Sequence, residues 1–585
     1  MSIYTATVID TSGIQPYIFG SNRLRENIGA SYLVNQATGA WVKGALVALS
    51  EALKKEQADS SCIYIPPETL SGATPRINQD LQIVAELIYT GGGNAIAVFR
   101  DRDYAIRFTQ ILSRRVLHEA PGLILSVAHQ DFDWDTKESL LKTIQQLRHK
   151  LEHDKPPKAP SSPLLGLSVT ADCTSTRLVA VGMSNEFDAP TDDAYLVSRE
   201  VQHKITAVPD SNKRLWRQLK IVIPEELPCE FPTDFDDLGR SRGESSYIAV
   251  VHADGNSMGD RFKQCGEGKS NEDYITAIRK LSRSVNDAGI TALRSVTQQL
   301  VNSVVDSDNN GKIIDGKLGQ FPLNKDEKTG RYYLPFRPLV YGGDDVAFVC
   351  DGRLGLELAA LYLEAFAQQT DPDGKPFSAC AGIAIVKTHY PFARAYALSE
   401  ALCGSAKTLI RNETNPTQQS ALDWHIATSG LLGSIGEIRQ REYQSVQKKS
   451  LVMRPLWLSH QDEWRTWAGF RHVTEDFVAG EDWKDRKNKV LALREVLRQG
   501  EVAIEEWLKI QKLRKPLPDE SEIEPEKTAI AQFLHVYKLD SLPSFPILNG
   551  KEKTLQTKGW VDGHCGYFDA IETMDFYLDI AGRNP

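Results

Sequence analysis

"VYGGDDVAFVC", residues 340–350, is a run of apolar and strand-forming residues interrupted by a Gly-Gly-Asp-Asp tetrad at 342–345. A second stretch, "YTGGGNAIAVF" at 89–99, has the same layout, with Gly-Gly-Gly-Asn at 91–94. Glycines between two apolar runs are typical of a tight β-hairpin. We therefore interpret the two stretches as copies of one hairpin, of which only the second carries adjacent carboxylates.

The elements around the two hairpins follow the same order. Each copy reads strand, helix, hairpin, helix, strand, helix, and the first strands end at Ser12-Gly13 and at Asp254-Gly255. This is the split βαβ order of a ferredoxin-like domain. In that arrangement the first strand and the hairpin lie side by side in an antiparallel sheet, so Asp254 is expected near the acidic hairpin tip. The predicted fold class is α+β, with two ferredoxin-like domains.

The rest of the chain divides around these two copies. A proline-rich linker, "HDKPPKAPSSPLL", follows the first copy, and the pattern after the second copy is helical. We predict a first domain over 1–152, a linker and small connecting domain over 153–244, a second domain over 245–430, and a C-terminal helical domain over 431–585.

Composition limits the function classes. The chain has 585 residues, 41% hydrophobic and 25% charged, as in an ordinary globular protein of several domains. No apolar run is long enough for a membrane helix, and no signal peptide is visible, so we expect a cytoplasmic protein without membrane contact. The eight cysteines contain no CxxC pair, which argues against a zinc ribbon. The net charge of −9 argues against a protein that coats nucleic acid by itself.

Two adjacent aspartates on a tight turn repel each other unless a cation offsets their charge. Asp254, Asp344 and Asp345 together would form an oxygen-only site, which Mg²⁺ or Mn²⁺ prefers over zinc. Gly342 and Gly343 have no Cβ and let a nucleotide phosphate approach the backbone. Such a site suits metal-dependent phosphoryl or nucleotidyl transfer.

Several ordered motifs resemble a known family, the large subunit of type III CRISPR effector complexes. "VIDTSGIQPYIFGSNRLRENIGASYLV" is similar to its first palm domain. "ADGNSMG", "RPLVYGGDDVAFV", "AGIAIVKTHYPFARAYALSEALCGSAK" and "ALDWHI" are similar to its second palm. The resemblance covers about residues 1–130 and 230–430. It implies a composite site in which the GGDD palm converts ATP to cyclic oligoadenylate, an antiviral second messenger.

The resemblance also implies roles for single residues. Asp254, Asp344 and Asp345 would be the catalytic metal ligands, and Gly342 and Gly343 would hold the triphosphate. Lys407 would bind phosphate, and Ser12 and Ser257 would contact the nucleotide, with helix capping as their structural alternative.

The chain departs from the family pattern at three points. Asn256 stands where many members have a further carboxylate, and the palm begins at residue 3 without a preceding HD nuclease domain. The cysteines between the palms do not form a four-cysteine zinc site. These departures leave the metal count open and argue against cleavage of single-stranded DNA.

Three functions remain open. The first is an ATP cyclase inside a CRISPR complex, with guide and target RNA held mainly by other subunits. The second is a free-standing palm cyclase of an antiphage system that makes a cyclic dinucleotide, acting as a homo-oligomer. The third is a catalytically silent scaffold subunit of an RNA-guided complex. We find no motif that indicates the ring size, linkage or base preference of the product, or the activating signal.

Overall fold

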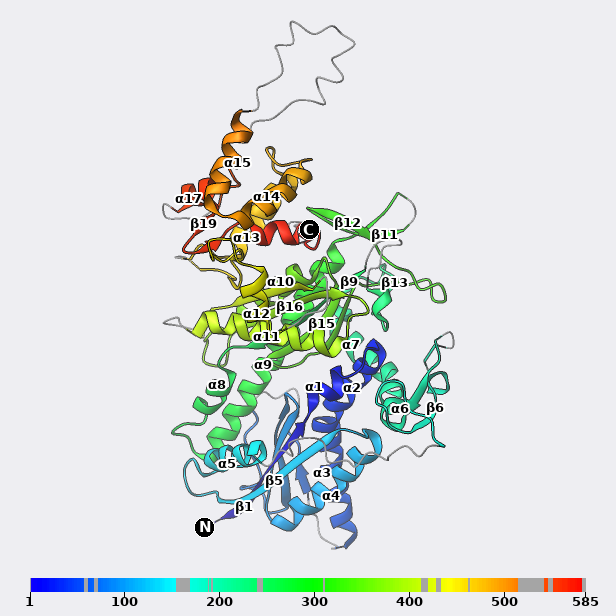
Figure 1. Ribbon diagram of the computed structural model, residues 1–585. Coiled ribbons are helices and arrows are strands. Elements are labelled where there is room, and N and C mark those ends of the chain that lie inside the picture. Colours follow the sequence, from blue (N-terminus) through cyan, green and yellow to red (C-terminus); the bar gives the residue numbers. More distant parts are fainter. Residues whose placement is uncertain are drawn as a thin grey trace.

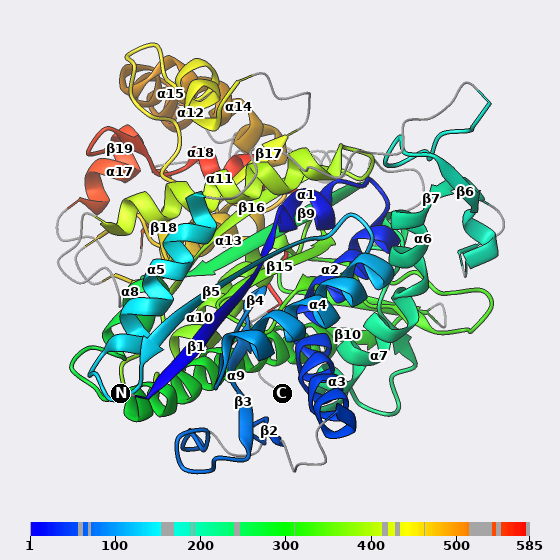
Figure 2. The same ribbon diagram turned by 90° about the horizontal axis from the view of Figure 1, so that it is seen from below.

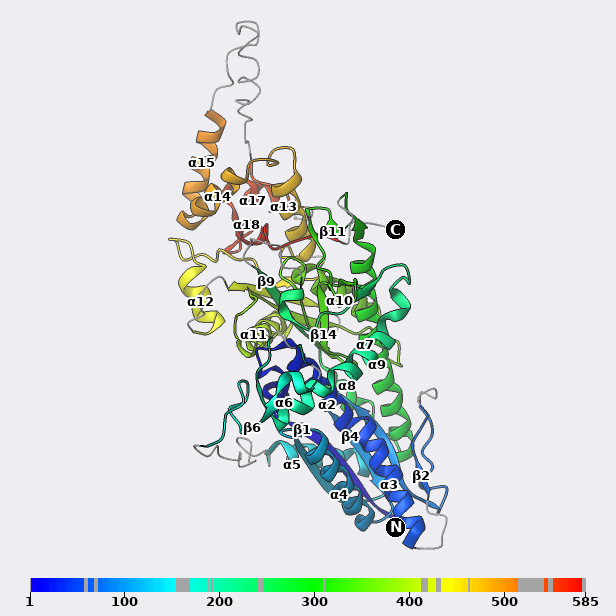
Figure 3. The same cartoon turned by 90° about the vertical axis from the view of Figure 1, so that its right-hand side faces the viewer.

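The computed structural model stacks three parts along one long axis: the first palm, the second palm and a C-terminal helical region (Figures 1 and 3). The described residues are 2–56, 62–67, 72–153, 169–187, 189–190, 193–238, 246–308, 311–411, 419–427, 433–460, 463–513, 541–545 and 551–580. The predicted linker at 153–165 lies almost wholly outside these residues. Within the described residues, none of the helices combines the length and the apolar character that a membrane span requires.

The first palm is a five-stranded sheet in the order β2-β3-β4-β1-β5. Its strands are β1 (Ile3–Ser12), β2 (Cys62–Tyr64), β3 (Ile83–Gly91), β4 (Asn94–Phe99) and β5 (Ile124–Asp133). Its helices are α1 (Ile14–Phe19), α2 (Leu24–Thr38), α3 (Ala40–Glu56), α4 (Arg102–Glu119) and α5 (Ser139–His153). Helices α2, α3 and α4 lie on one side of the sheet and α5 on the other (Figure 2).

Helix α4 illustrates how local sequence builds these layers. The Asp101 side chain caps the helix by accepting a hydrogen bond from the Asp103 N–H. The buried residues recur at spacings of three and four, as in an amphipathic helix: Ala105, Phe108, Leu112 and Val116. This stripe packs into the apolar core between the helices and the sheet.

The second palm has a six-stranded sheet in the order β14-β15-β9-β16-β17-β18. Its strands are β9 (Tyr247–Gly255), β14 (Phe336–Val340), β15 (Asp345–Asp351), β16 (Ala379–Lys387), β17 (Ala421–Ala427) and β18 (Leu456–Trp457). Its helices are α8 (Met258–Gln264), α9 (Asn271–Asn302), α10 (Gly355–Ala367) and α11 (Phe392–Arg411). The insertion between α9 and the hairpin forms β10 (Val304–Asp306), β11 (Lys312–Gly316) and β12 (Gly319–Pro322).

Smaller elements complete the chain. The connecting region contains β6 (Ala180–Met183), β7 (Leu196–Ser198), α6 (Arg199–Thr206), α7 (Val208–Leu219) and β8 (Cys229–Glu230), which pairs with β13 (Tyr332–Tyr333). The C-terminal region contains α12 (Ile435–Glu442), α13 (Trp467–Ala479), α14 (Lys487–Gln499), α15 (Glu501–Leu513), α17 (Glu552–Lys558) and α18 (Phe568–Thr573). It also has a short hairpin of β19 (Trp560–Val561) and β20 (His564–Cys565).

The duplication is visible in the strand register. In the first palm β1 lies between β4 and β5, and in the second β9 lies between β15 and β16, all antiparallel. The predicted α+β class with two ferredoxin-like palms is therefore confirmed. The predicted domain boundaries stay predictions, and β18 shows that the second sheet takes up a strand from beyond residue 430.

A buried ion pair joins the two palms. Arg279 of α9 donates to Glu86 of β3 at 2.8 Å, and the two side chains are 6% and 0% exposed. The same guanidinium also donates to the carbonyl oxygens of Leu87, Ile88 and Ala73. Since α9 belongs to the second palm and β3 to the first, this pair fixes one palm against the other.

We predict that Arg279→Ala destabilises the chain by about 3 kcal/mol, because it leaves the Glu86 carboxylate buried without its cation. Arg283→Ala on the same helix is the matched control, since Arg283 is 40% exposed in its ion pair with Asp287. That control should cost no more than about 1 kcal/mol. Urea denaturation of both variants measures the difference, and equal losses would contradict the assigned role of Arg279.

Candidate functional site

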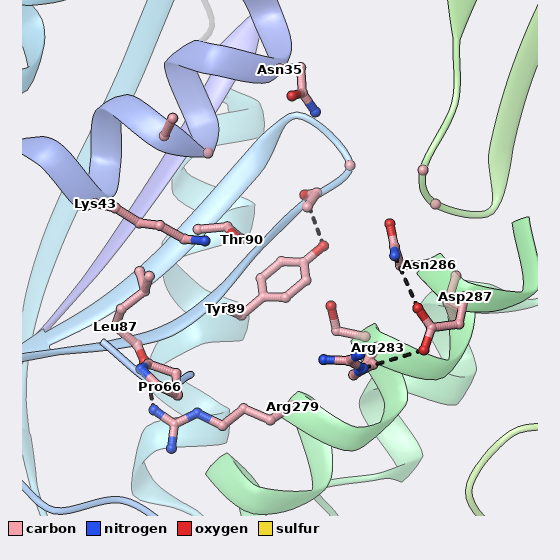
Figure 4. A pocket seen from close by; sticks show the side chains of 18 of the residues that line it. Asn35, Lys43, Pro66, Leu87, Tyr89, Thr90, Arg279, Arg283, Asn286 and Asp287 are labelled. Carbon is pink, nitrogen blue, oxygen red and sulfur yellow. Dashed lines mark hydrogen bonds and ion pairs between the residues drawn. The ribbon is translucent and has the colours of Figure 1, made fainter. Parts of the chain in front are cut away.

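The tips of the two hairpins lie opposite each other across a cavity of about 830 Å³ (Figure 4). The first hairpin contributes Gly91 and Gly92, and the second contributes Gly342, Gly343 and Asp344. Helices α2, α3, α7 and α9 complete the wall. The basic residues that line the cavity are Lys43, Lys213, Arg214, Arg217, Arg279 and Arg283. Three acidic residues, Asp210, Asp287 and Asp344, also line it, so the basic residues are in excess, and a cavity of this size and charge suits a polyanionic ligand such as a nucleotide.

Two glycines bring the GGDD hairpin against α9. Gly342 has a φ of 95°, a left-handed conformation that favours glycine. At Gly289 of α9, an added Cβ would lie 2.4 Å from the Gly343 carbonyl oxygen. Helix α9 therefore supports the hairpin backbone directly, and a larger residue at 289 would push it away.

The predicted acidic residues meet at the end of the central strands. Asp345 begins β15 and pairs across the sheet with Asp254 of β9, so both side chains lie on the same face. Asp344 precedes Asp345, and its carbonyl oxygen accepts a hydrogen bond from the Gly255 N–H. Lys407 of α11 donates to Asp254 at 2.5 Å. The structure thus brings together Asp254, Asp344, Asp345 and Lys407, which are far apart in the sequence.

Sequence reasoning missed two neighbours of this cluster. His252 lies two residues before Asp254 on β9, and its Nδ1 is 3.3 Å from the Asp345 carboxylate. Glu400 of α11 accepts a hydrogen bond at 2.6 Å from Gln15 in α1 of the first palm, and its charge acts on Asp345. The alternation of strand residues would have indicated His252, but no local pattern marks Glu400.

Burial and mutual repulsion raise the pKa values of the aspartates. Burial, followed by the charge of Asp254, raises the pKa of Asp344 to about 6. The same causes, with Asp344 and Glu400 added, raise the pKa of Asp345 to about 8. The Asp345 side chain is 49% exposed, so solvent screens part of this effect. Burial lowers the pKa of Lys407, but attraction to Asp254 and its hydrogen bond outweigh that and raise it overall.

The oxygen donors of this cluster suit a divalent cation whose remaining coordination positions are filled by the substrate. Among the described residues, no three His, Cys, Asp or Glu side chains are grouped as a ready-made metal site. The three-carboxylate site is therefore not preformed. Mg²⁺ in nucleotide enzymes often takes only one or two carboxylates and fills its other positions with phosphate and water. The carboxylates of Asp254 and Asp345, on residues paired across the sheet, with Asp344 next to Asp345, fit that arrangement, and the ammonium group of Lys407 supplies positive charge at Asp254.

The two serines do not occupy equivalent places. Ser12 is the last residue of β1, and its hydroxyl lies 3.1 Å from that of Ser126. Ser257 precedes α8 with a φ of 55° and makes no capping hydrogen bond. A left-handed serine is strained, and Gly13 takes the corresponding conformation before α1. Contact of either serine with a nucleotide stays a prediction.

The sheet register changes the alignment of the two copies. Asp10 pairs with Asn94 in the first palm as Asp254 pairs with Asp345 in the second. The first palm therefore keeps the strand carboxylate and has lost both hairpin carboxylates. Asn256 has a structural role, since its amide donates to Ser378 and to the Gln419 carbonyl.

Residues 247–415 match the family model described as Cas10/Cmr2, second palm domain. The chain carries a Cas10/Cmr2 second palm domain. The resemblance of this segment to the large subunit of type III CRISPR complexes is thereby confirmed. The segment contains the GGDD hairpin, Asp254 and Lys407.

The solved structures that this chain matches include several that contain Csm1. The Csm1-Csm4 cassette in complex with pppApApA is 15% identical, with 98% of this chain and 69% of that chain covered and a TM-score of 0.49. The cassette in complex with cA4 is 13% identical, covering 91% and 67%, with a TM-score of 0.45. Csm1 in T. onnurineus is 13% identical, covering 99% and 70%, with a TM-score of 0.47. The curated proteins contain no match.

We predict that Asp345→Asn raises the melting temperature of the metal-free protein at about pH 8. The ordinary pKa of 3.8 is raised to about 8 on folding, so the folded state holds its proton more tightly. Stability is therefore lost as pH rises between these two values, and the amide abolishes that loss. The gain should shrink as pH falls toward about 4.

Differential scanning calorimetry across this pH range measures the effect, with Asp260→Asn on α8 as an exposed control. An Asp345→Asn variant that melts at the wild-type temperature throughout would contradict the repulsion inferred at the hairpin.

Proposed function

We propose that this chain is a metal-dependent nucleotidyltransferase that converts ATP to cyclic oligoadenylate, as the large subunit of a type III CRISPR antiviral complex. One observation carries the proposal: a Cas10/Cmr2 second palm in which Asp254 and Asp345 face each other directly across the central strands. A sheet tolerates like charges in that position poorly unless a cation joins them. The fold does not need them, since the first palm has Asn94 in place of Asp345.

The cavity between the hairpins supports ATP as the substrate. Its volume of about 830 Å³ has room for more than one nucleotide, and both hairpin backbones reach it. Lys213 and Arg217 of α7 line the same cavity as Gly342 and Gly343 and supply positive charge for triphosphate groups. The first palm then holds one ATP and the second palm holds the other.

Each residue of the cluster has a role in this proposal. Asp254, Asp344 and Asp345 hold Mg²⁺ or Mn²⁺, which activates the attacking ribose hydroxyl and neutralises phosphate charge when bound. Gly342 and Gly343 let the phosphates approach the hairpin backbone. Lys407 is held at Asp254 and binds phosphate when a metal ion takes its place. Pyrophosphate leaves at each transfer, and the last transfer closes the ring.

The partners follow from the same assignment. We propose that the chain acts with other CRISPR subunits, which hold the guide RNA and the target RNA. The net charge of −9 supports this division, because an acidic chain has no general affinity for nucleic acid.

A free-standing palm cyclase that makes a cyclic dinucleotide is the second candidate. It would use the same cluster and the same cavity, without RNA, in a homo-oligomer. RNA dependence of the activity separates the two. A silent scaffold is disfavoured, because the second hairpin keeps both carboxylates that the first has lost.

The test is incubation of the purified chain, alone and with its copurifying subunits, with Mn²⁺ and each labelled nucleoside triphosphate. Product masses are compared with and without target RNA. We expect a cyclic adenylate that falls by at least about a hundredfold in Asp344→Ala/Asp345→Ala, since metal binding and phosphate neutralisation are lost together. Asp260→Ala is the control and should keep full activity.

Formation of the product without RNA would favour the free-standing cyclase. If neither the isolated chain nor its complex forms a product, while Asp260→Ala and wild type are equally folded, the assignment as an enzyme is contradicted. The scaffold subunit is then the remaining alternative.

A further inference from the structure

Strand β5 forms an open edge of the first palm. It is the outermost strand of its sheet, and it pairs with β1 in unbroken register over ten residues (Figure 1). Edge strands of this length are usually shortened, bulged or protected by lysine or proline, because their backbone can pair with other chains. The sequence of β5, "ILSVAHQDFD", has no lysine or proline, and its charged residues, Asp131 and Asp133, lie only at its C-terminal end.

The backbone groups that face this edge can be identified from the hydrogen bonds on the other side. The Thr11 N–H donates to Gly93, toward β4, so the even-numbered residues of β1 face β5. The Trp134 N–H donates to Ser2, which continues the same pattern. The even-numbered residues of β5 therefore bond to β1, and the odd-numbered ones point outward: Leu125, Val127, His129 and Asp131. Within the part of the chain that the structure describes, no backbone hydrogen bond reaches the outward groups of these four.

In the second palm, the equivalent edge is covered by another strand. Ser126 of β5 corresponds to Cys380 of β16, since they pair with Asp10 and Asp254 respectively. The outer side of β16 is covered by β17, which runs parallel to it. Among the described residues the first palm has no strand in that position. One copy of the duplicated fold thus has its edge paired by a strand, and the other leaves the same edge open.

A cavity of about 360 Å³ lies at the open edge. It is lined by four consecutive residues of β5, Ser126 to His129, whose side chains alternate between the two faces. A cavity that touches all four must follow the strand edge itself. Its other lining residues are Arg102 in the first turn of α4 and Lys150 and Leu151 in the last turn of α5. This groove lies where an added strand would pair with β5, and it has a basic residue on either side.

We propose that β5 docks an extended, acidic segment of a partner protein, which adds to the first palm as a strand parallel to β5. The inference rests on the proposed place of the chain in a multisubunit complex. The backbone of Val127, His129 and Asp131 pairs with the segment, as Ala381, Ile383 and Ile385 pair with β17 in the second palm. Arg102, 51% exposed and 3.6 Å from the Asp131 carboxylate of β5, and Lys150 line the groove, and their positive charge favours acidic side chains in the segment.

The first measurement is hydrogen exchange of residues 124–133 in the isolated chain and in the complex purified through it from its own host. The outward-facing amides should exchange about tenfold more slowly in the complex, while the inward-facing ones change little. In the same complex, a carbodiimide cross-link should join the Lys150 amine to an aspartate or glutamate of an identified partner segment.

Two variants test the strand and the charge separately. Val127→Pro removes an outward N–H and no bond to β1, so the chain should stay folded and lose both the partner and the protection. Lys150→Glu should weaken partner binding at least about tenfold, since it reverses the charge beside the groove. Lys142→Glu on the same helix, 64% exposed, is the matched control and should bind normally.

Three results would overturn the proposal. The first is equal protection of the β5 amides in the isolated chain and in the complex. The second is a lack of protection of these amides in the complex. The third is normal assembly of Val127→Pro. Protection that appears only with dimerisation of the isolated chain would also overturn it, in favour of a second copy. Nucleotide products measured on the same samples keep the hypotheses apart, because a chain that makes cyclic adenylate with an unprotected β5 contradicts only the docking surface.

Discussion

The cross-strand pairing of Asp254 with Asp345 is the constraint on which the rest of the site depends. The register of β9 and β15 fixes two carboxylates opposite each other, where their repulsion is strongest. Asp344 adds a third charge at the turn. The surrounding structure relieves this repulsion only in part, through one ammonium group at Asp254 and raised pKa values at the hairpin. The unrelieved repulsion is the physical basis for proposing that this palm binds a cation.

The duplicated architecture places the hairpin of the first palm opposite the GGDD hairpin of the second palm. Helix α9 connects them physically: Arg279 is bound to β3 of the first palm, and Gly289, on the same helix, contacts Gly343. Because one rigid helix carries both contacts, the separation of the hairpin tips across the cavity is set by the packing of the palms. The first palm keeps Asp10 but has glycine and asparagine at the hairpin, so its hairpin lines the cavity without adding a carboxylate.

Much of this fold was predictable because its signals are local. Apolar periodicity, the two glycine hairpins and the repeated element order predicted the two palms. The GGDD tetrad indicated its own residues as candidates for the site. The two predicted ends of the first strands, Ser12-Gly13 and Asp254-Gly255, are not equivalent positions, since the register matches Thr11, not Gly13, with Gly255. Glycine can follow a strand at any offset, whereas strand pairing fixes the register. The Arg279–Glu86 pair joins residues 193 positions apart, and Glu400 reaches the site only through the packing of α11, so no local pattern predicts either.

The most direct test of the central claim is a crystal structure of the chain with Mn²⁺ and a non-hydrolysable ATP analogue, using the anomalous signal of manganese to locate the metal. The account predicts manganese at Asp254 together with Asp344 or Asp345, no manganese between Asp10 and Asn94, and phosphates against both glycine hairpins. Manganese bound equally in both palms, or nucleotide bound away from the cavity between them, would contradict it.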